Sequence, residues 1–361
     1  MKYNDIRRKT REVRIANKVI GGNSPIAIQS MTNTDTHNKQ ATLEQIIALG
    51  NAGCDIVRIT VPDLEAAETI AYIKERGIDI PVVADIHFDH RIAIRCAELG
   101  VDKIRINPGN IGDDENVRAV CRACKSRNIP IRIGVNGGSL EKHILAKYGA
   151  PTPEALCESA MYHIALLEKF DFYDTVVSMK ISDPYKMIKA NELLASRCDY
   201  PLHLGVTEAG ARERGLLKSA VGIGALLCEG IGDTIRVSLT DDPLREIEAA
   251  RNILQAAGIE GQSGLEIISC PTCGRTKIDL IGLVKNFENA AKKEKILDLP
   301  LKVAIMGCAV NGPGEAREAD IGVAGGKGEA ILIRKGEIIR KIPEDKIVET
   351  LICEIKKLGG R

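Results

Sequence analysis

Short apolar runs rich in β-branched residues alternate with longer amphipathic stretches along most of the chain. Each run has the length of a buried strand, about four to eight residues, and the stretches between the runs carry helical spacing. The runs that we take as strands lie at residues 26–30, 56–61, 82–86, 103–108, 131–136, 175–182, 202–207 and 234–239. Eight strand–helix repeats predict an α/β fold, a (β/α)8 TIM barrel. A doubly wound open sheet is the alternative, disfavoured because no Gly-x-Gly-x-x-Gly turn follows the first run.

The pattern changes after a glycine-rich segment at residues 258–264, where we place a domain boundary. We expect residues 1–260 to form the barrel, with residues 13–20 as a small hairpin that plugs its bottom. We expect residues 265–361 to form a small α+β domain. Its predicted elements are a helix at 280–293, strands at 302–306 and 320–323, a hairpin of 330–334 with 337–340, and a final helix at 344–357.

Composition narrows the range of partners. The net charge is +1, so no global field draws the protein to nucleic acid or to a membrane, and an anion must be held by a local cluster. Aromatic residues make up only 3% and Trp is absent, which weighs against base stacking and a nucleic-acid partner. No apolar run approaches the roughly 18 residues of a membrane span, and no signal peptide is recognisable. We expect a cytoplasmic protein whose eleven cysteines form no disulfides.

Polar and charged residues recur where the predicted strands end. Active sites of such barrels lie at the carboxyl ends of the strands, and residues two apart on a strand share a face. We therefore expect one mouth to gather these side chains: Arg58, Asp85, His87, Arg105, Asn107, Arg132, Asn136, Lys180, Glu208, Arg236 and Ser238.

The basic members of this set predict an anion site. Four Arg and one Lys in one partly dry cavity repel one another unless a highly charged anion neutralises them, and guanidinium groups bind phosphate oxygens in pairs. The alternative places each Arg on the outside of its strand, paired with a helix carboxylate. We favour the interior because the neighbours of these residues, such as Val57, Ile59, Ile104 and Ile106, are apolar and suit the helix-packed outside. His87 is either an acid–base or hydrogen-bonding group of the site, or a structural side chain.

Three cysteines of the second domain lie among loop-forming residues. Cys270 and Cys273 form a Cys-Pro-Thr-Cys-Gly sequence, and Cys308 precedes an Asn-Gly-Pro-Gly turn. Loop thiols suit metal or redox chemistry. Three thiolates fit a four-iron cluster with one non-cysteine ligand, and the nearest oxygen ligand is Glu315 on the Gly-Pro-Gly loop. A zinc ribbon needs a second ligand pair, and a disulfide oxidoreductase needs only the first.

Three other cysteines provide a contrast. Cys121 and Cys124 also form a Cys-x-x-Cys pair, but they lie in a helical run without breakers and are expected to fill the space under that helix. Cys353, in the final predicted helix, is expected to be a core thiol.

Several long motifs resemble one enzyme family, 4-hydroxy-3-methylbut-2-enyl diphosphate synthase of the non-mevalonate isoprenoid pathway. The resemblance covers the whole chain. The motifs are Gln29-Ser-Met-Thr-Asn-Thr-Asp-Thr, Ala84-Asp-Ile-His-Phe, Arg105-Ile-Asn-Pro-Gly-Asn, Arg132-Ile-Gly-Val-Asn-Gly-Gly-Ser, Arg236-Val-Ser-Leu, Cys270-Pro-Thr-Cys-Gly-Arg-Thr and Gly307-Cys-Ala-Val-Asn-Gly-Pro-Gly-Glu. The short connection between the two domains is similar to that of the family's two-domain form.

The resemblance implies a reaction and a cofactor. The family reduces 2-C-methyl-D-erythritol 2,4-cyclodiphosphate to the linear hydroxymethylbutenyl diphosphate with two electrons and loss of water, and flavodoxin or ferredoxin supplies the electrons. Its [4Fe-4S] cluster implies Cys270, Cys273, Cys308 and Glu315 as ligands here. Glu208 is our candidate proton donor for the departing water.

The resemblance also implies a homodimer, and the chain length agrees with it. A helix of about 16 residues after the eighth strand descends about 24 Å, which leaves a linker of at most about 36 Å to bring the second domain back to the mouth. We therefore expect each active site to be shared between two chains. The alternative function is a barrel that binds a phosphorylated metabolite, with a structural zinc in the small domain.

Overall fold

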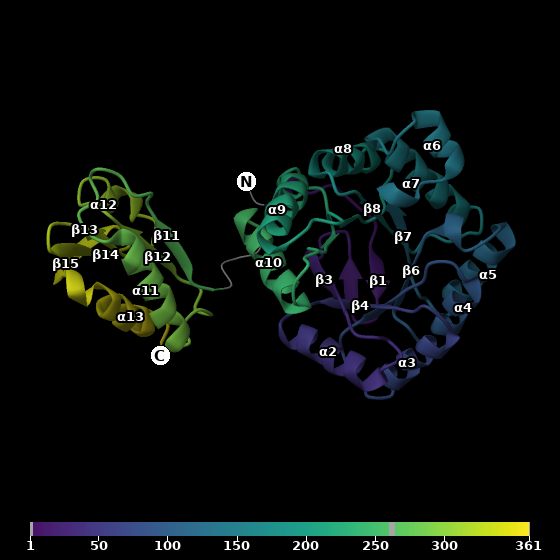
Figure 1. Ribbon diagram of the computed structural model, residues 1–361, viewed down its shortest axis with the longest axis horizontal. Helices are drawn as coiled ribbons and strands as arrows, with labels where there is room; N and C mark the ends of the chain where they lie inside the picture. Colours follow the sequence, from purple (N-terminus) through teal and green to yellow (C-terminus); the bar gives the residue numbers. More distant parts are fainter. Residues whose placement is uncertain (1–2, 260–263, 361) are drawn as a thin grey trace. The chain divides into compact units, whose positions relative to one another are not determined.

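The computed structural model describes residues 3–259 and 264–360. The chain divides into two compact units, Met1–Ile259 and Glu260–Arg361. Each unit has its own ring or sheet of strands and its own core (Figure 1). The boundary expected at residues 258–264 includes 260–263, which lie outside the described residues.

The first unit is a parallel barrel, as predicted. Its sheet has the order β8-β7-β6-β5-β4-β3-β10-β9. A parallel bridge between Val177 of β8 and Leu202, the residue before β9, joins the two ends of this order. The ring therefore closes, and the open-sheet alternative is wrong. The strands are β3 (Ala27–Met31), β4 (Ile56–Thr60), β5 (Val82–Asp85), β6 (Lys103–Ile106), β7 (Ile131–Asn136), β8 (Thr175–Lys180), β9 (His203–Leu204) and β10 (Thr234–Ile235).

The last two strands are shorter than their apolar runs suggested. Predicted strands at 202–207 and 234–239 contain only the two-residue ladders β9 and β10. The chain after β9 passes so close to the chain after β10 that a Cβ on Gly205 would lie 2.6 Å from the backbone oxygen of Arg236. This close approach leaves the regular ladder but keeps both segments at the barrel mouth.

Helices surround the barrel (Figure 1). Most of them begin at an Asp, Asn or Thr whose side chain accepts a hydrogen bond from the first turn, which is the reason that these residues follow the strands in the sequence. The ring consists of α2 (Lys39–Asn51), α3 (Leu64–Lys74), α4 (His90–Glu98), α5 (Asp114–Lys125), α7 (Pro153–Glu168), α8 (Pro184–Ala195), α9 (Arg212–Cys228) and α10 (Pro243–Ala256). Shorter helices are α1 (Tyr3–Ile6), η1 (Pro108–Asn110), η2 (Gly137–Ser139) and α6 (Lys142–Tyr148).

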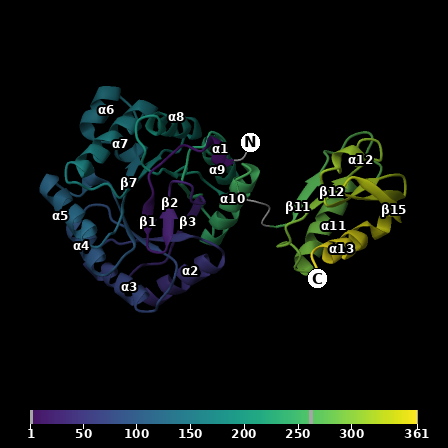
Figure 2. The ribbon, with the colours of Figure 1, turned by 180° about the vertical axis from the view of Figure 1, so that it is seen from behind.

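An antiparallel hairpin closes the amino-terminal end of the barrel, as the sequence predicted. It consists of β1 (Val13–Ile15) and β2 (Lys18–Ile20), and it lies across the ring when the molecule is seen from behind (Figure 2). Ile15 and Ile20 are fully buried against Ala27, Ile56 and Val83, which stand at or near the starts of three barrel strands. The hairpin therefore seals one end of the barrel with apolar side chains.

The second unit is an α+β domain, as predicted. Its sheet has the order β11-β12-β13-β14-β15, in which the first three strands are parallel and the last three antiparallel to their neighbours. Strand β11 and the short helix α12 are additions to the predicted elements. The elements are β11 (Glu266–Ser269), α11 (Leu280–Lys293), β12 (Lys302–Met306), α12 (Gly312–Glu315), β13 (Ile321–Gly325), β14 (Glu329–Arg334), β15 (Glu337–Pro343), η3 (Glu344–Lys346) and α13 (Ile347–Leu358).

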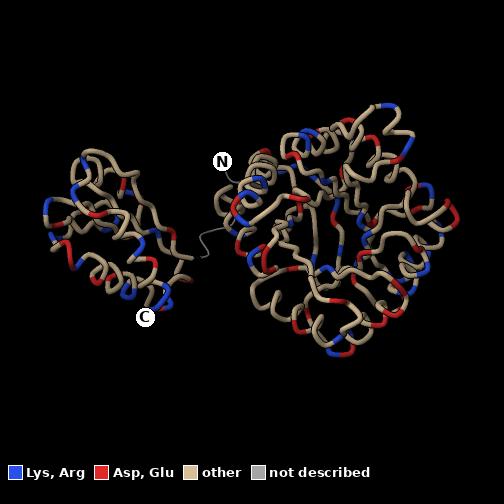
Figure 3. Tube along the Cα trace, in the orientation of Figure 1, with Lys and Arg blue, Asp and Glu red and all other residues tan. Residues whose placement is uncertain are grey.

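Charge and hydropathy agree with the composition. Lys and Arg are interspersed with Asp and Glu around the helices of the barrel (Figure 3). Within residues 3–259 and 264–360 no helix is long and apolar enough to cross a membrane. All eleven cysteines are free.

Candidate functional site

The basic residues of the strands point into the barrel. Their apolar neighbours Val57, Ile59, Ile104, Ile106 and Ile133 belong to the core between the strands and the helices. Because side chains alternate along a strand, the residues between them face inward. The inward cations are buried, with exposed fractions of 9% for Arg58, 5% for Arg105, 1% for Arg132 and 7% for Lys180.

Arg236 joins this cluster but has a helix carboxylate beside it. Its positive charge helps to lower the pKa values of Arg58, Arg132 and Lys180, so Arg236 faces the same barrel interior. Its Nε lies 3.4 Å from Oε2 of Glu246, which is buried on α10. The alternative of helix-paired arginines is thus wrong for the other four cations and holds in part for Arg236.

Asp85 is the carboxylate at the centre of the cluster. Its Oδ2 accepts a hydrogen bond from Arg58, and its Oδ1 lies 3.1 Å from Nη1 of Arg105. Nε2 of the half-exposed His87 is 3.2 Å from the same carboxylate. Burial alone would raise the pKa of Asp85, but the charges of Arg58 and Arg105 outweigh it and lower that pKa to about 2. Asp85 therefore stays ionised and holds the two arginines in place.

Cations still outnumber carboxylates in the barrel interior. Burial, reinforced by Arg105 and Arg236, lowers the pKa of Arg58 to about 10. Burial and the arginines around it also hold the pKa of Lys180 well below its ordinary value. Groups in this state are stabilised by an incoming anion, because it offsets the repulsion that each of them feels. The barrel interior thus has a surplus of buried positive charge that an anion would offset.

Three buried polar residues deeper in the barrel were not among the predicted site residues. Lys103 precedes Arg105 by two positions on β6, and His203 lies on β9. Gln29 on β3 accepts a hydrogen bond of 3.3 Å from Nη1 of Arg132. The signal that could have found Lys103 is its place on the same strand face as Arg105. Lys103 is the first residue of its strand, whereas the active sites of such barrels lie at the carboxyl ends.

The polar residues of the mouth have different surroundings. Asn107 is buried, and its Oδ1 accepts a hydrogen bond from the backbone N–H of Gly109 at 3.2 Å, so it shapes the loop after β6. Asn136 precedes η2 without capping it, and Ser238 is half-buried after β10. Glu208 lies on the loop after β9, is exposed, and has a φ of +51°. The catalytic role expected for Glu208 stays a prediction.

A largely buried hydrogen bond between His163 and Glu141 joins the loops after β6 and β7 to α7. Nε2 of the fully buried His163 lies 2.5 Å from Oε1 of Glu141, which follows η2. A Cβ on Gly109 would lie 2.9 Å from Cε1 of His163, so the loop after β6 packs directly on this pair. Burial works against the Glu141 carboxylate, but the hydrogen bond from His163 outweighs it, and the pKa of Glu141 is lowered to about 2.

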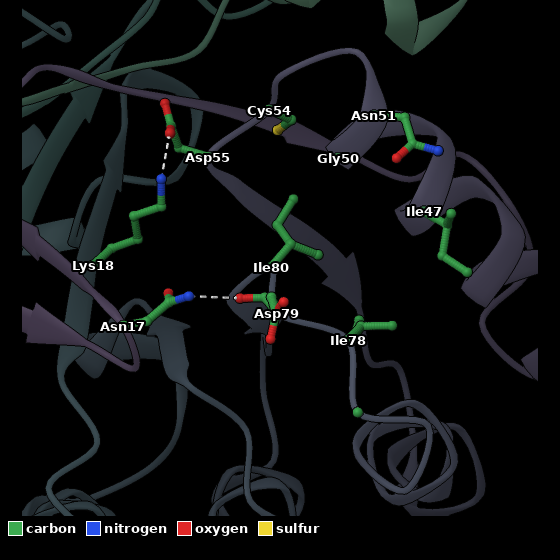
Figure 4. Close-up of a pocket in the computed structure, with 11 residues that line it drawn as sticks. Asn17, Lys18, Ile47, Gly50, Asn51, Cys54, Asp55, Ile78, Asp79 and Ile80 are labelled. Carbon is green, nitrogen blue, oxygen red and sulfur yellow. Dashed lines mark hydrogen bonds and ion pairs between the residues drawn. The ribbon is translucent and has the colours of Figure 1, made fainter.

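A hollow of about 490 Å³ lies beside the hairpin, at the end of the barrel where the strands begin (Figure 4). The turn of the hairpin and the segment before β5 line it, and Asn17 donates a hydrogen bond to the backbone oxygen of Asp79. Its one lysine, Lys18, is paired with Asp55 at 2.8 Å. This hollow has no surplus of positive charge and is not an anion site.

The three loop cysteines follow neighbouring parallel strands. Cys270 comes directly after β11, and Cys308 follows β12 by two residues. The backbone N–H of Gly307 lies 3.2 Å from Sγ of Cys270, and the N–H of Lys277 is bonded to the oxygen of Gly307. The loop that carries Cys273 is thus tied to the end of β12.

The surroundings of Cys308 favour the thiolate form of its side chain. Backbone N–H groups of Asn311, Val310 and Gly312 at the start of α12 lower the pKa of its thiol. Glu315 is the last residue of α12 and is exposed. In the part of the chain that the structure describes, no three His, Cys, Asp or Glu side chains are grouped closely enough to hold a metal ion.

The contrasting cysteines differ in outcome. Cys121 and Cys124 are buried under α5, as predicted, and burial raises the pKa of Cys121 to about 12. The prediction for Cys353 is wrong, because this thiol is exposed. Ile347, Leu351 and Ile355 form the buried face of α13, and position 353 falls on the opposite side of the helix.

Comparison with known proteins extends over both units. Residues 10–251 match the GcpE TIM-barrel domain, and residues 266–357 match the GcpE protein C-terminal domain. The chain belongs to the GcpE family. It is 57% identical over 353 residues to 4-hydroxy-3-methylbut-2-en-1-yl diphosphate synthase (flavodoxin) of Caldanaerobacter subterraneus, covering 98% of each chain. It is 57% identical to the enzyme of the same name from Clostridium perfringens, covering 98% of this chain and 99% of that one.

The barrel alone is similar to that of other families. A dihydropteroate synthase from Stenotrophomonas maltophilia superposes with a TM-score of 0.52 over 70% of this chain and 100% of that one, at 11% identity. At this identity the likeness shows the fold and nothing of the reaction.

We predict that Glu141→Gln lowers the free energy of unfolding by about 2 kcal/mol at pH 7, the worth of a hydrogen bond to a charged group. The pKa of Glu141 is about 2 in the folded protein, against an ordinary 4.5. The stabilisation is therefore complete above about pH 4.5, and the difference from wild type shrinks as the pH falls toward 2.

Urea unfolding between pH 3 and pH 7 measures this difference. Glu75→Gln, at the exposed end of α3, is the matched control and should change stability by less than about 0.5 kcal/mol. A difference that stayed constant from pH 7 to pH 3 would contradict the role of the ionised carboxylate.

Proposed function

We propose that this protein reduces 2-C-methyl-D-erythritol 2,4-cyclodiphosphate to (E)-4-hydroxy-3-methylbut-2-enyl diphosphate, opening the ring and losing water, in isoprenoid biosynthesis. The observation that carries the proposal is the group of cations inside the barrel, with Asp85 and Glu246 as its carboxylates. A cyclic diphosphate supplies the negative charge that this group requires. Relatives 57% identical over nearly their full length have the name of this enzyme.

The barrel cations bind and orient the diphosphate. Arginine forks pair with phosphate oxygens through two hydrogen bonds each, whereas Lys180 acts as a point charge. Asp85 fixes Arg58 and Arg105, so these donors are in position before the substrate arrives. Charge grows on a diphosphate oxygen as the ring C–O bond breaks, and preorganised cations stabilise that charge. His87, Asn107, Asn136 and Ser238 complete the proposed binding set at the mouth.

The second domain is the proposed place of the iron–sulfur cofactor, a [4Fe-4S] cluster. Its proposed ligands are Cys270, Cys273, Cys308 and Glu315. The donor set fits, because the three thiols follow adjacent strand ends and the backbone N–H groups around Cys308 favour its thiolate. When bound, such a cluster supplies single electrons, which no side chain can.

Protons and electrons must reach the substrate from outside the cation cluster. Glu208 is the proposed acid that protonates the departing hydroxyl. It is a carboxyl group on an exposed loop at the mouth, and within the described residues no hydrogen bond of its side chain holds it away from the opening. Flavodoxin is the proposed electron donor, because the relatives' names include it, with ferredoxin as the other candidate. We place the reaction in the cytoplasm, where eleven free thiols persist.

We further propose a homodimer in which each active site is shared. Helix α10 has 14 residues, follows the eighth strand, and descends about 21 Å toward the sealed end of its barrel. The segment from there to β11 spans at most about 36 Å when extended. To serve the same barrel, this segment would have to climb about 21 Å and then bring a folded domain over the centre of the mouth, which leaves it little slack. A pair with two-fold symmetry avoids this, because the cluster of one chain serves the barrel of its partner.

The first experiment tests the reaction and the cluster ligands together. Purified without oxygen, the wild type should contain iron and sulfide and turn over the cyclodiphosphate with reduced flavodoxin. Cys270→Ser, Cys273→Ser and Cys308→Ser should lose the cluster, whereas Cys121→Ser, Cys124→Ser and Cys353→Ser should keep it. Glu315→Ala should keep a cluster with an altered spectrum and lose most activity. A redox-silent zinc and no turnover would support a metabolite-binding protein instead.

The second experiment tests the anion site. Lys180→Ala or Arg132→Ala should weaken cyclodiphosphate binding by about 3–5 kcal/mol, the cost of breaking one partner of a buried charge pair, with cluster content unchanged. Lys125→Ala, on the exposed side of α5, is the control and should bind normally. Equal affinity of wild type and both site variants would overturn the assignment.

The third experiment tests the shared site by complementation. Lys180→Ala and Cys308→Ser chains are unfolded together, refolded anaerobically and reconstituted with iron and sulfide. A heterodimer with shared sites contains one intact barrel facing one intact cluster, so activity returns. If each site belongs to a single chain, every site has one lesion, and verified, cluster-loaded heterodimers stay inactive.

A further inference from the structure

The cationic interior of the barrel extends below the predicted substrate site. Lys103 on β6 and His203 on β9 are both fully buried, on the inward faces of their strands. Nδ1 of His203 is hydrogen-bonded to the hydroxyl of Thr234. Within the described residues, Nζ of Lys103 and Nε2 of His203 have no hydrogen-bond partner. The mechanism above uses neither group.

This deeper layer is surrounded mainly by positive charge. The pKa of Lys103 is lowered by the charges of Arg132 and Arg58. The pKa of His203 is lowered by those of Arg132, Lys180, Lys103 and Arg58. Lys180 stands directly beside the β9 segment, since a Cβ on Gly205 would lie 3.2 Å from its Nζ. The charged groups that face the layer from the barrel wall and from α10 are Arg58, Asp85, Arg105, Arg132, Lys180, Arg236 and Glu246. Below it stand the apolar side chains of the hairpin.

Complete burial, the lack of a hydrogen-bond partner at Nζ and Nε2 within the described residues, and the surrounding cations all favour the uncharged forms of Lys103 and His203. Burial is the largest cause, and the neighbouring cations add to it, so that the pKa of Lys103 and that of His203 lie well below their ordinary values. A diphosphate above them changes the balance, because its negative charge cancels much of the field of the arginines. In a poorly screened interior this change acts over several ångströms.

We propose that Lys103 and His203 form a proton-accepting layer beneath the anion site, which takes up a proton from solvent when a diphosphate binds above it. This inference rests on the proposed function, because it takes the diphosphate as the anion. Neither residue needs to touch the substrate. They act by matching the charge of the barrel to that of its ligand, and they make binding depend on pH.

The sign of this dependence follows from linkage. A ligand that binds together with a proton binds more weakly as the pH rises, by up to about tenfold per pH unit for each proton taken up. Burial and the same arginines also lower the pKa of Lys180, so an anion favours the charged form of this residue as well. Comparison of variants that all retain Lys180 removes its contribution.

Isothermal titration calorimetry of the anaerobic holoenzyme, without reductant, measures the protons directly. Cyclodiphosphate and inorganic pyrophosphate are titrated at pH 8 in two buffers of different ionisation enthalpy, and the difference in heat gives the number of protons taken up. Lys103→Met keeps the shape of the side chain without its basic group. Lys125→Met is the control on the exposed face of α5. His203→Asn is a second variant, and thermal unfolding checks that each one folds.

We expect Lys103→Met or His203→Asn to take up fewer protons than wild type, by about half a proton or more, and to lose part of the pH dependence of the dissociation constant. Lys125→Met should match wild type. Equal proton uptake in wild type and both folded variants would overturn the proposal. Failure of the proposed function is distinguishable, because it would abolish turnover and cyclodiphosphate binding while pyrophosphate still reports the proton count.

Discussion

Repulsion among buried cations inside the barrel is the interaction on which the rest of the structure depends. Arg58, Arg105, Arg132 and Lys180 are buried in an interior where water screens them poorly. The fold tolerates this because the core between strands and helices is almost entirely apolar and stabilises the barrel independently of its interior. The stability of the apolar core thus offsets the repulsion inside the barrel and permits an interior that favours ligand binding over its own stability.

Two carboxylates, Asp85 and Glu246, hold the buried cations in position. Asp85 is central and fixes two arginines, so it sets their geometry without neutralising the whole group. Glu246 reaches Arg236 from α10 and also accepts a hydrogen bond from the hydroxyl of Ser30, which couples the last barrel helix to the first barrel strand. Removal of either carboxylate would therefore disturb position as well as charge. The positive charge that the two carboxylates leave unbalanced is the feature on which the proposed binding of a diphosphate rests.

Sequence patterns predicted the architecture well because alternation and length are local properties. The inward direction of Arg58, Arg105 and Arg132 followed from their apolar neighbours, and the hairpin followed from its position before the first strand. Glu246 and His163 could not be foreseen, since their partners are distant in sequence and meet only in the folded barrel. The exposed Cys353 was misassigned because helical phase, rather than residue type, decides which side faces the core.

The hairpin of β1 and β2 closes one end of the barrel, so that the mouth is its one opening in the described structure. In the described structure Ile15 and Ile20 pack on the apolar side chains at the starts of the strands, which closes this end to an anion. Substrate and product must then use the same opening in succession, and each excludes the other while it is bound. Release of the diphosphate product therefore precedes every new binding event, and accumulated product competes with substrate for the same cations.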